Sequence, residues 1–402
     1  MSDYAYVWLL MLNRDYISGI LTSMTSVRRS FELPNLGHIK NKTEPPTLNK
    51  LTKFIHNKGK EISYNGPKID HDIKENDIEF VDLNANVNTS TTTTKPKTKS
   101  SNDKIYNEYK TCNPDLIVMV TPDITVEDRK ILLQIADQVI EIDYIEKKSV
   151  KLGTKRQQEL YDSWMNKSYT KMNCLKLIKY KKVLFLDADI IVVENINHLF
   201  ELKTPAICTS TPFSFPFGSI PSLKIPISEI DNSGFIANNI KYGYRDHGIQ
   251  ISYQDMEYAL NKHVNLLCGT SFLIGPDLSD FDLYIKILNE KNRHVMHMKD
   301  AYGNPSNPSG FDEQSIADLY IHKKQDFTNI HYKYNFISWK AGTLKEKPAI
   351  MHYFSDSKPW NATKFEWIDT KTWFQMTLYA ISKYKIKEGY KPETLSIIKT
   401  MV

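Results

Sequence analysis

Residues 182–193 read Lys-Val-Leu-Phe-Leu-Asp-Ala-Asp-Ile-Ile-Val-Val, so two acids interrupt an apolar run. A short run rich in β-branched and aromatic residues is typical of a strand buried on both faces. Because an unpaired buried charge is costly, Asp187 and Asp189 are expected where the strand emerges, at an edge or turn that opens on a cleft. The stretch therefore predicts a buried sheet with a functional site at the end of this strand.

Asp187 and Asp189 are separated by one residue. In an extended chain, side chains i and i+2 point the same way, so both carboxylates can share one target. Two hard oxygen ligands aimed at one point favour Mg²⁺ or Mn²⁺, especially a cation that also holds phosphates. The alternative is that the two acids are only solvated or cap a helix.

Length and composition narrow the class of protein. At 402 residues, with 41% hydrophobic and 11% aromatic residues, the chain is an ordinary globular protein of one large or two small domains. Its formal net charge of +5 does not require a nucleic-acid partner. The sequence shows neither a long apolar span nor a signal peptide, so we expect a cytoplasmic protein without a transmembrane segment. Its four scattered cysteines, without zinc spacing, are expected to be reduced: Cys112, Cys174, Cys208 and Cys268.

The order of the predicted elements indicates an α/β fold. Residues 5–12 form a strong apolar run, residues 13–16 break it, and a helical pattern follows to Val27. This is the usual opening of a nucleotide-binding fold, in which ligands bind at the carboxyl ends of the strands. The β-α-β alternation predicts a largely parallel sheet. The later patterns predict strands over 116–120, 139–143, 266–276 and 350–353, and helices over 125–137, 170–180, 278–288, from 311 and over 373–384.

We expect one catalytic domain, 1–402, interrupted by inserts. Residues 31–110 lose periodicity and are rich in Lys, Asn, Asp and Thr, and the low-complexity stretch at about 85–105 is predicted to be disordered. Residues 205–262 have mixed character and read as a second insertion, and residues 363–402 read as a C-terminal helical tail.

Four anchors, taken in order, carry a family resemblance. They are the first strand with Asn13 and Tyr16, Lys171 sixteen residues before Asp187, Phe-Leu-Asp-Ala-Asp at 185–189, and His-Tyr-Phe-Ser-Asp-Ser-Lys-Pro-Trp at 352–360. Together they resemble the glycogenin-like enzymes of glycosyltransferase family 8, whose pattern for the last anchor is His-x-x-Gly-x-x-Lys-Pro-Trp. Tyr-Arg-Asp-His-Gly at 244–248 is loosely similar to a viral branch. The resemblance implies a GT-A fold, a Rossmann-like, mixed but mostly parallel sheet flanked by helices.

The same resemblance implies a retaining enzyme that transfers a hexose from a UDP-sugar with the help of Mn²⁺, or alternatively Mg²⁺. It implies that Asp187, Asp189 and His352 are the metal ligands, a mixed oxygen and nitrogen set that Mn²⁺ tolerates. Lys358 would lie against the diphosphate and stabilise the departing UDP. The implied donor-binding residues are Leu10, Leu12, Asn13, Tyr16, Arg156, Lys171, Asp187, Ala188, Asp189, Cys268, Gly269, Ser355 and Lys358. The implied catalytic residues are Asp312, Glu313, Gln314 and Lys358.

The expected chemistry is front-face substitution, in which the leaving phosphate helps to deprotonate the acceptor hydroxyl while Glu313 or Gln314 orients the sugar. Three departures from the family pattern surround the sugar. Cys268-Gly269-Thr270 replaces Asn-Ser-Gly, Ser355 replaces Gly, and Glu313 replaces Asp. The donor sugar is therefore open, with glucose first and galactose or another hexose next.

The sequence leaves the partners undetermined. The acceptor hydroxyl could belong to a protein, a glycan or a lipid, with the insertion 205–262 on its side of the site, and the chain could form a homodimer. The region of the self-glucosylated Tyr of glycogenin has no counterpart, so self-priming is not expected. If the viral resemblance holds, the location is the host cytoplasm.

Two other classes compete with this reading. A haloacid-dehalogenase-like phosphatase also carries Asp-x-Asp after a strand, with the first Asp as nucleophile and the second as general acid. That class does not explain His352, Lys358 and Trp360. The other alternative is a non-catalytic protein that binds a nucleotide-sugar in a degenerate pocket.

Overall fold

A computed structural model of the chain describes the residues that build the fold. They are 2–33, 113–147, 155, 159, 163–209, 247–248, 250–254, 256–257, 267–290, 311–337, 348–353, 358–363 and 368–401. The chain divides into two compact units, one of Met1–Gly37 with Glu108–Val402 and one of His38–Asn107. The second unit, with the stretch 85–105 predicted to be disordered, lies outside the described residues. The fold below is that of the first unit.

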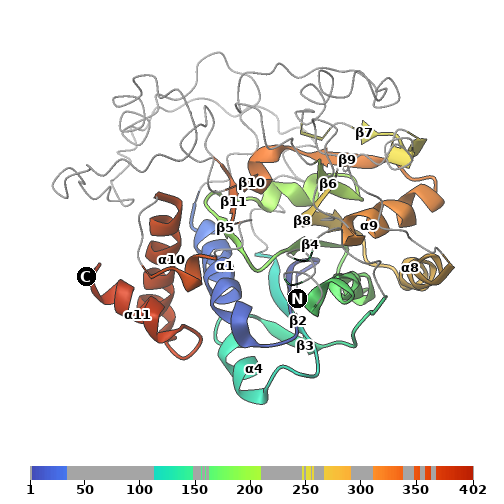
Figure 1. Ribbon diagram of the computed structural model, residues 1–402. Coiled ribbons are helices and arrows are strands. Elements are labelled where there is room, and N and C mark those ends of the chain that lie inside the picture. Colours follow the sequence, from blue (N-terminus) through green and yellow to red (C-terminus); the bar gives the residue numbers. More distant parts are fainter. Residues whose placement is uncertain are drawn as a thin grey trace, which may run out of the picture. The chain divides into compact units, whose positions relative to one another are not determined.

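The first unit is built on an eight-stranded sheet with the strand order β3-β2-β1-β4-β8-β6-β9-β7 (Figure 1). Strands β3, β2, β1 and β4 are parallel, and so are β6 and β9, whereas β8 is antiparallel to both of its neighbours and β7 to β9. The predicted α/β class with a mixed, mostly parallel sheet is confirmed. The strands are β1 Tyr4–Leu10, β2 Asp115–Val120, β3 Gln138–Glu141, β4 Lys182–Leu186, β6 Ala206–Thr209, β7 Gln250–Ile251, β8 Leu267–Ile274 and β9 Phe327–Ile330.

Both faces of the sheet are buried, as its apolar strands predict. Along β1, Tyr6, Trp8 and Leu10 belong to one hydrophobic cluster, whereas Ala5 and Val7 belong to another. Successive strand side chains point to opposite faces, so this alternation divides the core into two layers.

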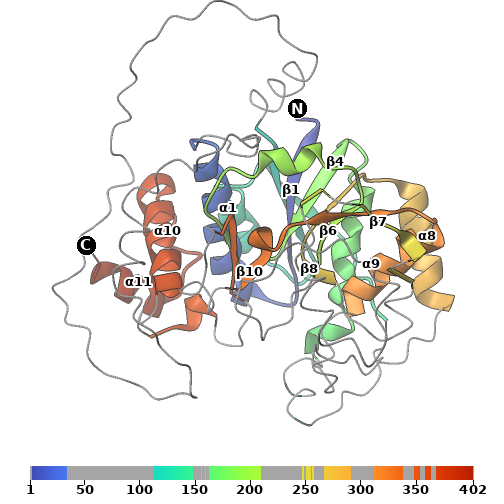
Figure 2. The ribbon, with the colours of Figure 1, turned by 90° about the horizontal axis from the view of Figure 1, so that it is seen from above.

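Helices cover each of these faces, with α1, α10 and α11 on one side and α8 and α9 on the other (Figure 2). The α-helices are α1 Ile17–Ser30, α4 Val126–Leu132, α8 Leu278–Glu290, α9 Phe311–His322, α10 Ile368–Tyr384 and α11 Pro392–Lys399. The 3₁₀ helices are η1 Arg14–Tyr16, η3 Ser168–Lys176, η4 Asn197–Glu201, η6 Tyr332–Asn335 and η8 Pro359–Asn361.

The two acids lie in a turn between two sheets. After Leu186 the chain leaves the main sheet, and at Ile190 it enters a three-stranded sheet of order β10-β11-β5, with β5 Ile190–Val192, β10 Phe336–Ile337 and β11 Ile350–His352. The Asp187 N–H donates to the carbonyl of Thr270 at 2.9 Å, and the Asp189 carbonyl accepts from the Tyr353 N–H at 2.8 Å. The prediction that the acids lie where the strand emerges is confirmed.

Three predicted elements differ from the observed ones. The helix predicted over 125–137 begins as expected after the N-cap Thr125 but ends at Leu132, because the Asp137 carboxylate accepts from the Leu116 N–H at 2.7 Å and ties the chain to β2. The segment 170–180 forms a 3₁₀ helix, Ser168–Lys176, in which the Asn173 amide bonds to backbone carbonyls. Strand β8, predicted over 266–276, begins one residue later and ends two residues earlier, at Leu267–Ile274.

The structure describes only parts of the predicted insertion 205–262 and of the predicted C-terminal tail 363–402. Strands β6 and β7, near the two ends of segment 205–262, belong to the main sheet. The C-terminal tail is helical, as predicted, with α10 beginning at Ile368. No helix in the part of the chain that the structure describes is long and apolar enough to cross a lipid bilayer.

Candidate active site

Lys358 and Asp189 form a nearly buried ion pair at the carboxyl end of β4. The Lys358 Nζ lies 2.7 Å from Asp189 Oδ2 and donates a second hydrogen bond to the Tyr353 carbonyl at 2.8 Å. Both side chains are little exposed, 13% for the lysine and 12% for the acid. The last anchor of the sequence therefore lies against the Asp-Ala-Asp turn, although it is 169 residues away.

Lys171 lies on the other side of the turn and joins three acceptors. Its Nζ is 2.5 Å from Asp312 Oδ2, 3.3 Å from the Gly269 carbonyl and 3.5 Å from Asp187 Oδ1. Lys171 comes from η3, Asp312 from the first turn of α9 and Gly269 from β8. Segments far apart in sequence thus converge on one charged cluster.

His352 ends β11 and faces Asp189 across the small sheet. It pairs with Ile190 in an antiparallel register, and its Nε2 lies 3.6 Å from Asp189 Oδ1. Its Nδ1 lies 2.9 Å from Asn335 Oδ1 and 3.3 Å from Thr270 Oγ1. An amide oxygen can only accept, so the His352 Nδ1–H donates to Asn335.

Asn335 is a site residue that the sequence did not reveal. Its Nδ2 donates to Cys268 Sγ at 2.7 Å, so Cys268, Asn335 and His352 form a chain of contacts. Cys268 was predicted to touch the donor, and in the structure its sulfur is engaged with Asn335 and Thr270. A lone Asn before a two-residue strand carries no signal that would have identified it.

The electrostatics of the two aspartates differ. Burial raises the pKa of Asp187 to about 6, although the Lys171 ammonium opposes the rise. Burial acts on Asp189 in the same direction, but Lys358 and His352 outweigh it and hold the pKa of that carboxyl well below its usual range. The negative charge of Asp189 is therefore compensated by Lys358 and His352, whereas a further cation would stabilise the ionised form of Asp187.

Tyr16 and Trp360 form an aromatic wall beside the turn. The Tyr16 ring is 42% exposed and meets the buried Trp360 edge-on, with ring centroids 5.2 Å apart. Trp360 in turn packs on Gly19 of α1, where a Cβ would lie 2.7 Å from Trp360 Cζ3 and 2.6 Å from the Ala188 carbonyl oxygen. Gly19 therefore permits α1, the Asp-Ala-Asp turn and the Lys-Pro-Trp segment to meet.

The turn after β1 is held by local hydrogen bonds. Leu12 has φ +72°, and its N–H donates to the Tyr144 hydroxyl at 2.9 Å, which donates to Asp123 Oδ1 at 2.8 Å. The Asn13 side chain accepts from the Asp15 N–H at 2.7 Å and caps η1. Leu10 was predicted to contact the donor, but its side chain is buried in the core, so only its backbone is available for that contact.

The acids predicted to be catalytic lie at the start of α9. Asp312 pairs with Lys171, Glu313 Oε1 accepts from the Gly269 N–H at 3.1 Å, and Gln314 is buried. Two other predicted donor residues, Arg156 and Ser355, lie outside the described residues.

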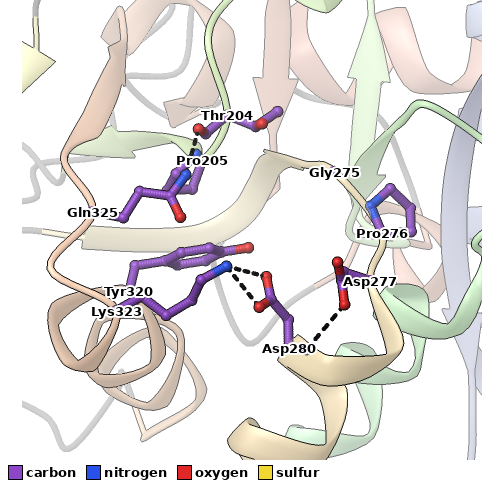
Figure 3. A pocket seen from close by; sticks show the side chains of 9 residues that line it. All are labelled: Thr204, Pro205, Gly275, Pro276, Asp277, Asp280, Tyr320, Lys323 and Gln325. Atoms are coloured by element: carbon purple, nitrogen blue, oxygen red, sulfur yellow. Dashed lines mark hydrogen bonds and ion pairs between the residues drawn. The ribbon is translucent and has the colours of Figure 1, made fainter.

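A cavity of about 280 Å³ lies at the opposite end of β8 from Gly269 (Figure 3). The Tyr320 hydroxyl and the Lys323 ammonium point into it. The Lys323 Nζ is 2.6 Å from both carboxylate oxygens of Asp280, and Asp277 Oδ1 accepts from the Ser279 N–H at 2.7 Å. The ion pair between Lys323 and Asp280 thus stabilises the corner between α8 and α9. None of the predicted site residues lines this cavity.

Residues 8–265 match the sequence profile described as "Glycosyl transferase family 8". Because the match covers more than half of the chain, the protein belongs to glycosyltransferase family 8. The predicted enzyme class is confirmed: the protein is a glycosyltransferase of the retaining GT-A type, with the sheet architecture given above.

Individual relatives match to different extents. An uncharacterized protein of Acanthamoeba polyphaga mimivirus is 33% identical over 253 residues, which is 61% of this chain and 72% of the relative. Glycogenin-1 of Homo sapiens is 34% identical over 87 residues, 21% of this chain and 23% of its own length. Among solved structures, the galactosyltransferase LgtC in complex with donor and acceptor sugar analogs has 10% identity and a TM-score of 0.39, with 92% of this chain and 95% of that chain covered. The predicted glycogenin-like resemblance with a viral relative is confirmed.

Proposed function

We propose that this glycosyltransferase transfers a hexose, glucose first, from a UDP-sugar to a hydroxyl acceptor with the help of a divalent cation. The observation that carries the proposal is the charged cluster at the carboxyl end of β4, where Asp189 lies between Lys358 and His352. Asp187, Lys171 and Asp312 extend the same cluster. Alternating acids and ammonium groups at a strand end suit a nucleotide diphosphate and its cation.

The residues fit such a cation by their chemistry. Among the described residues, no three His, Cys, Asp or Glu side chains form a ready-made metal site. Even so, Asp189 Oδ1 and His352 Nε2 lie 3.6 Å apart, and burial disfavours the ionised form of Asp187, which an added cation would stabilise. Mn²⁺ suits this oxygen and nitrogen set, with Mg²⁺ as the alternative. When bound, the cation would neutralise charge on the diphosphate oxygens.

The chain's own residues supply the rest of the chemistry. Lys358 would exchange its Asp189 contact for a phosphate oxygen and so stabilise the leaving UDP. In front-face substitution, the bond from the sugar C1 to the phosphate oxygen breaks while the acceptor oxygen bonds to C1 from the same side. The acceptor proton then passes to the leaving phosphate. Tyr16, exposed beside Trp360, would contact the nucleoside.

A panel of UDP-sugars tests this proposal. Release of UDP from UDP-glucose, UDP-galactose and other UDP-hexoses is measured with and without Mn²⁺, in the wild type and in Asp189→Ala. We expect release with one preferred hexose, dependent on the cation and lost in Asp189→Ala. Asp280→Ala is the matched control, because it breaks another short Asp–Lys ion pair, with Lys323 at 2.6 Å, at the far end of β8.

The other outcomes separate the competing readings. Binding of UDP-sugars without any release or transfer would support the non-catalytic alternative. Turnover of a phosphomonoester in place of a UDP-sugar would support the phosphatase alternative, which family membership already disfavours.

A further inference from the structure

The cavity of Figure 3 is separate from the charged cluster. It lies beyond the end of β8, at Gly275, whereas Gly269 of the same strand contacts Glu313 and Lys171. The two glycines are six positions apart, which corresponds to about 20 Å of extended chain. The walls come from the start of α8, the end of α9 and the segments that lead into β6 and β9. The cavity is therefore a site of its own.

A buried hydroxyl group points into this cavity without a protein partner. Tyr320 is 2% exposed, and its ring packs edge-on against Phe327, with ring centroids 5.8 Å apart. Its hydroxyl makes no hydrogen bond within the part of the chain that the structure describes (Figure 3). Burial and then the Asp280 carboxylate raise the pKa of Tyr320 well above its usual value, so the hydroxyl keeps its proton. An unpaired buried hydroxyl costs free energy that an acceptor on a ligand would recover.

The charges around the cavity disfavour an anion. The Lys323 ammonium is engaged by both carboxylate oxygens of Asp280, each at 2.6 Å. Asp277 adds an exposed carboxylate, whose Oδ1 accepts from the Ser279 N–H at 2.7 Å and from the Ser279 hydroxyl at 2.6 Å. The charged lining residues are these two acids and one lysine, so a phosphate or carboxylate would meet net repulsion. A metal ion or an organic cation would in turn meet the Lys323 ammonium.

The uncharged lining groups suit a ligand that both donates and accepts hydrogen bonds. Gln325 Nε2 donates to the Thr204 carbonyl at 2.9 Å, which orients the amide and leaves its oxygen as an acceptor. The Tyr320 hydroxyl is a donor, and Pro205 and Pro276 add apolar surface. A sugar ring combines hydroxyl groups with C–H faces. The volume of about 280 Å³ is just below the range of about 300–1,000 Å³ for small-molecule sites, so it suits a single sugar unit.

We propose that this cavity binds one uncharged hexose unit, with Tyr320 donating to one sugar hydroxyl and Gln325 accepting from another. Asp277 is exposed and the Lys323 side chain is 30% exposed, so the cavity is open to a hexose that belongs to a glycan chain. A second sugar site would retain such a glycan on the enzyme and raise its effective concentration. The inference goes beyond the proposed function, because it requires neither UDP nor a cation.

Replacement of one tyrosine by phenylalanine tests the site. Dissociation constants of glucose, galactose, mannose, maltose and lactose are measured by saturation-transfer NMR for the wild type, Tyr320→Phe and Tyr284→Phe. We expect saturable binding of one or more of these sugars, weakened about three- to tenfold in Tyr320→Phe, the effect of one hydrogen bond. Tyr284→Phe is the matched control, because this similarly buried tyrosine bonds to Ser315 at 2.9 Å and does not line the cavity. Equal affinity in the wild type and Tyr320→Phe, or no saturable binding, overturns the proposal.

Stability and ligand charge give two further measurements. Tyr320→Phe removes an unpaired hydroxyl, so its urea midpoint should equal or exceed that of the wild type, whereas Tyr284→Phe should lower the midpoint. Glucuronate and galacturonate, which carry a carboxylate at C6, should bind more weakly than glucose and galactose. A lower midpoint in Tyr320→Phe, or uronates that bind as tightly as the parent sugars, overturns the proposal.

UDP distinguishes this cavity from the proposed active site. UDP with Mn²⁺ should not compete with the sugar, and Tyr320→Phe should bind UDP as the wild type does. Competition by UDP would assign the sugar to the active site and overturn the proposal. Sugar binding that is weakened in Tyr320→Phe, in a protein that releases no UDP from any UDP-hexose, would remove the proposed function and retain this site.

Discussion

At the scale of single residues, the site is a balance of acids and ammonium groups. Lys358 compensates Asp189, and Lys171 compensates Asp312 and part of the charge of Asp187. A diphosphate with its cation can enter such a site by exchanging partners, because both the acids and the lysines find new opposite charges. The proposed ligand, which carries charges of both signs, matches this balance.

The contact between Asn335 and His352 leads to a prediction about metal affinity. Asn335→Ala removes the side-chain oxygen that accepts from the His352 Nδ1–H and orients the imidazole. Loss of a partner of this kind weakens metal binding by about tenfold or more. Titration of Mn²⁺ into the UDP-bound protein, followed by electron paramagnetic resonance, measures the effect. Asn173→Ala is the control, because its amide bonds to the backbone near η3. Equal Mn²⁺ affinity in the wild type and Asn335→Ala would refute the role.

At the scale of elements, the site depends on how α1, the β4–β5 turn and η8 pack together. Gly19 lies where the backbone of Ala188 and the ring of Trp360 both approach the helix. Gly19 lies in the first turn of α1, where glycine is a poorer helix former than alanine, so its presence here has a packing reason. The short contacts identify that reason as space for the turn and the tryptophan.

Gly19→Ala should therefore disturb both stability and activity. The new methyl group would overlap the Ala188 carbonyl oxygen, at 2.6 Å, and Trp360 Cζ3, at 2.7 Å. We expect a loss of about 1–3 kcal/mol in the free energy of unfolding, which exceeds the helix propensity gained, and weaker UDP binding. Urea unfolding and calorimetry with UDP measure the two effects. Gly275→Ala is the matched control, because its nearest contacts would be 3.6 Å. Similar behaviour of the two variants would contradict the packing role.

The elements also show what sequence reasoning can and cannot provide. Apolar runs predicted β1, β2 and β4, and the cost of a buried charge placed Asp187 and Asp189 at the strand end. Local pattern did not distinguish the 3₁₀ helix η3 from an α-helix, and the hydrogen bond of the Asn173 side chain to the Asp143 carbonyl joins η3 to a segment that a local pattern does not include. Asn335 and Gly19 matter only through contacts with residues distant in sequence, and one sequence carries no record of such contacts.

At the scale of the whole molecule, the two core layers bury ionisable tyrosines. Burial raises the pKa of Tyr6, Tyr320 and Tyr353 well above the usual value. Above about pH 10 the unfolded chain releases these phenolic protons while the folded chain keeps them. The unfolded state then binds fewer protons, so the free energy of unfolding falls as pH rises.

Alkaline titration tests this expectation. Phenolate absorbance and circular dichroism are followed together as the pH rises above about 10. We expect part of the tyrosine absorbance to appear only when the protein unfolds, and urea midpoints to decline over the same range. Complete and reversible tyrosine ionisation with unaltered circular dichroism would show that these side chains are accessible.

The central claim is that the cluster around Asp189 holds a nucleotide diphosphate together with a divalent cation. Calorimetric titration of UDP with and without Mn²⁺, into the wild type and Asp189→Asn, tests it most directly. Asp280→Asn serves as the control, because it disrupts the equivalent pair with Lys323. We predict that UDP binds tightly only with Mn²⁺, that Asp189→Asn abolishes this dependence and that Asp280→Asn retains it. UDP binding that is indifferent to Mn²⁺, or equal in the wild type and Asp189→Asn, would contradict the claim.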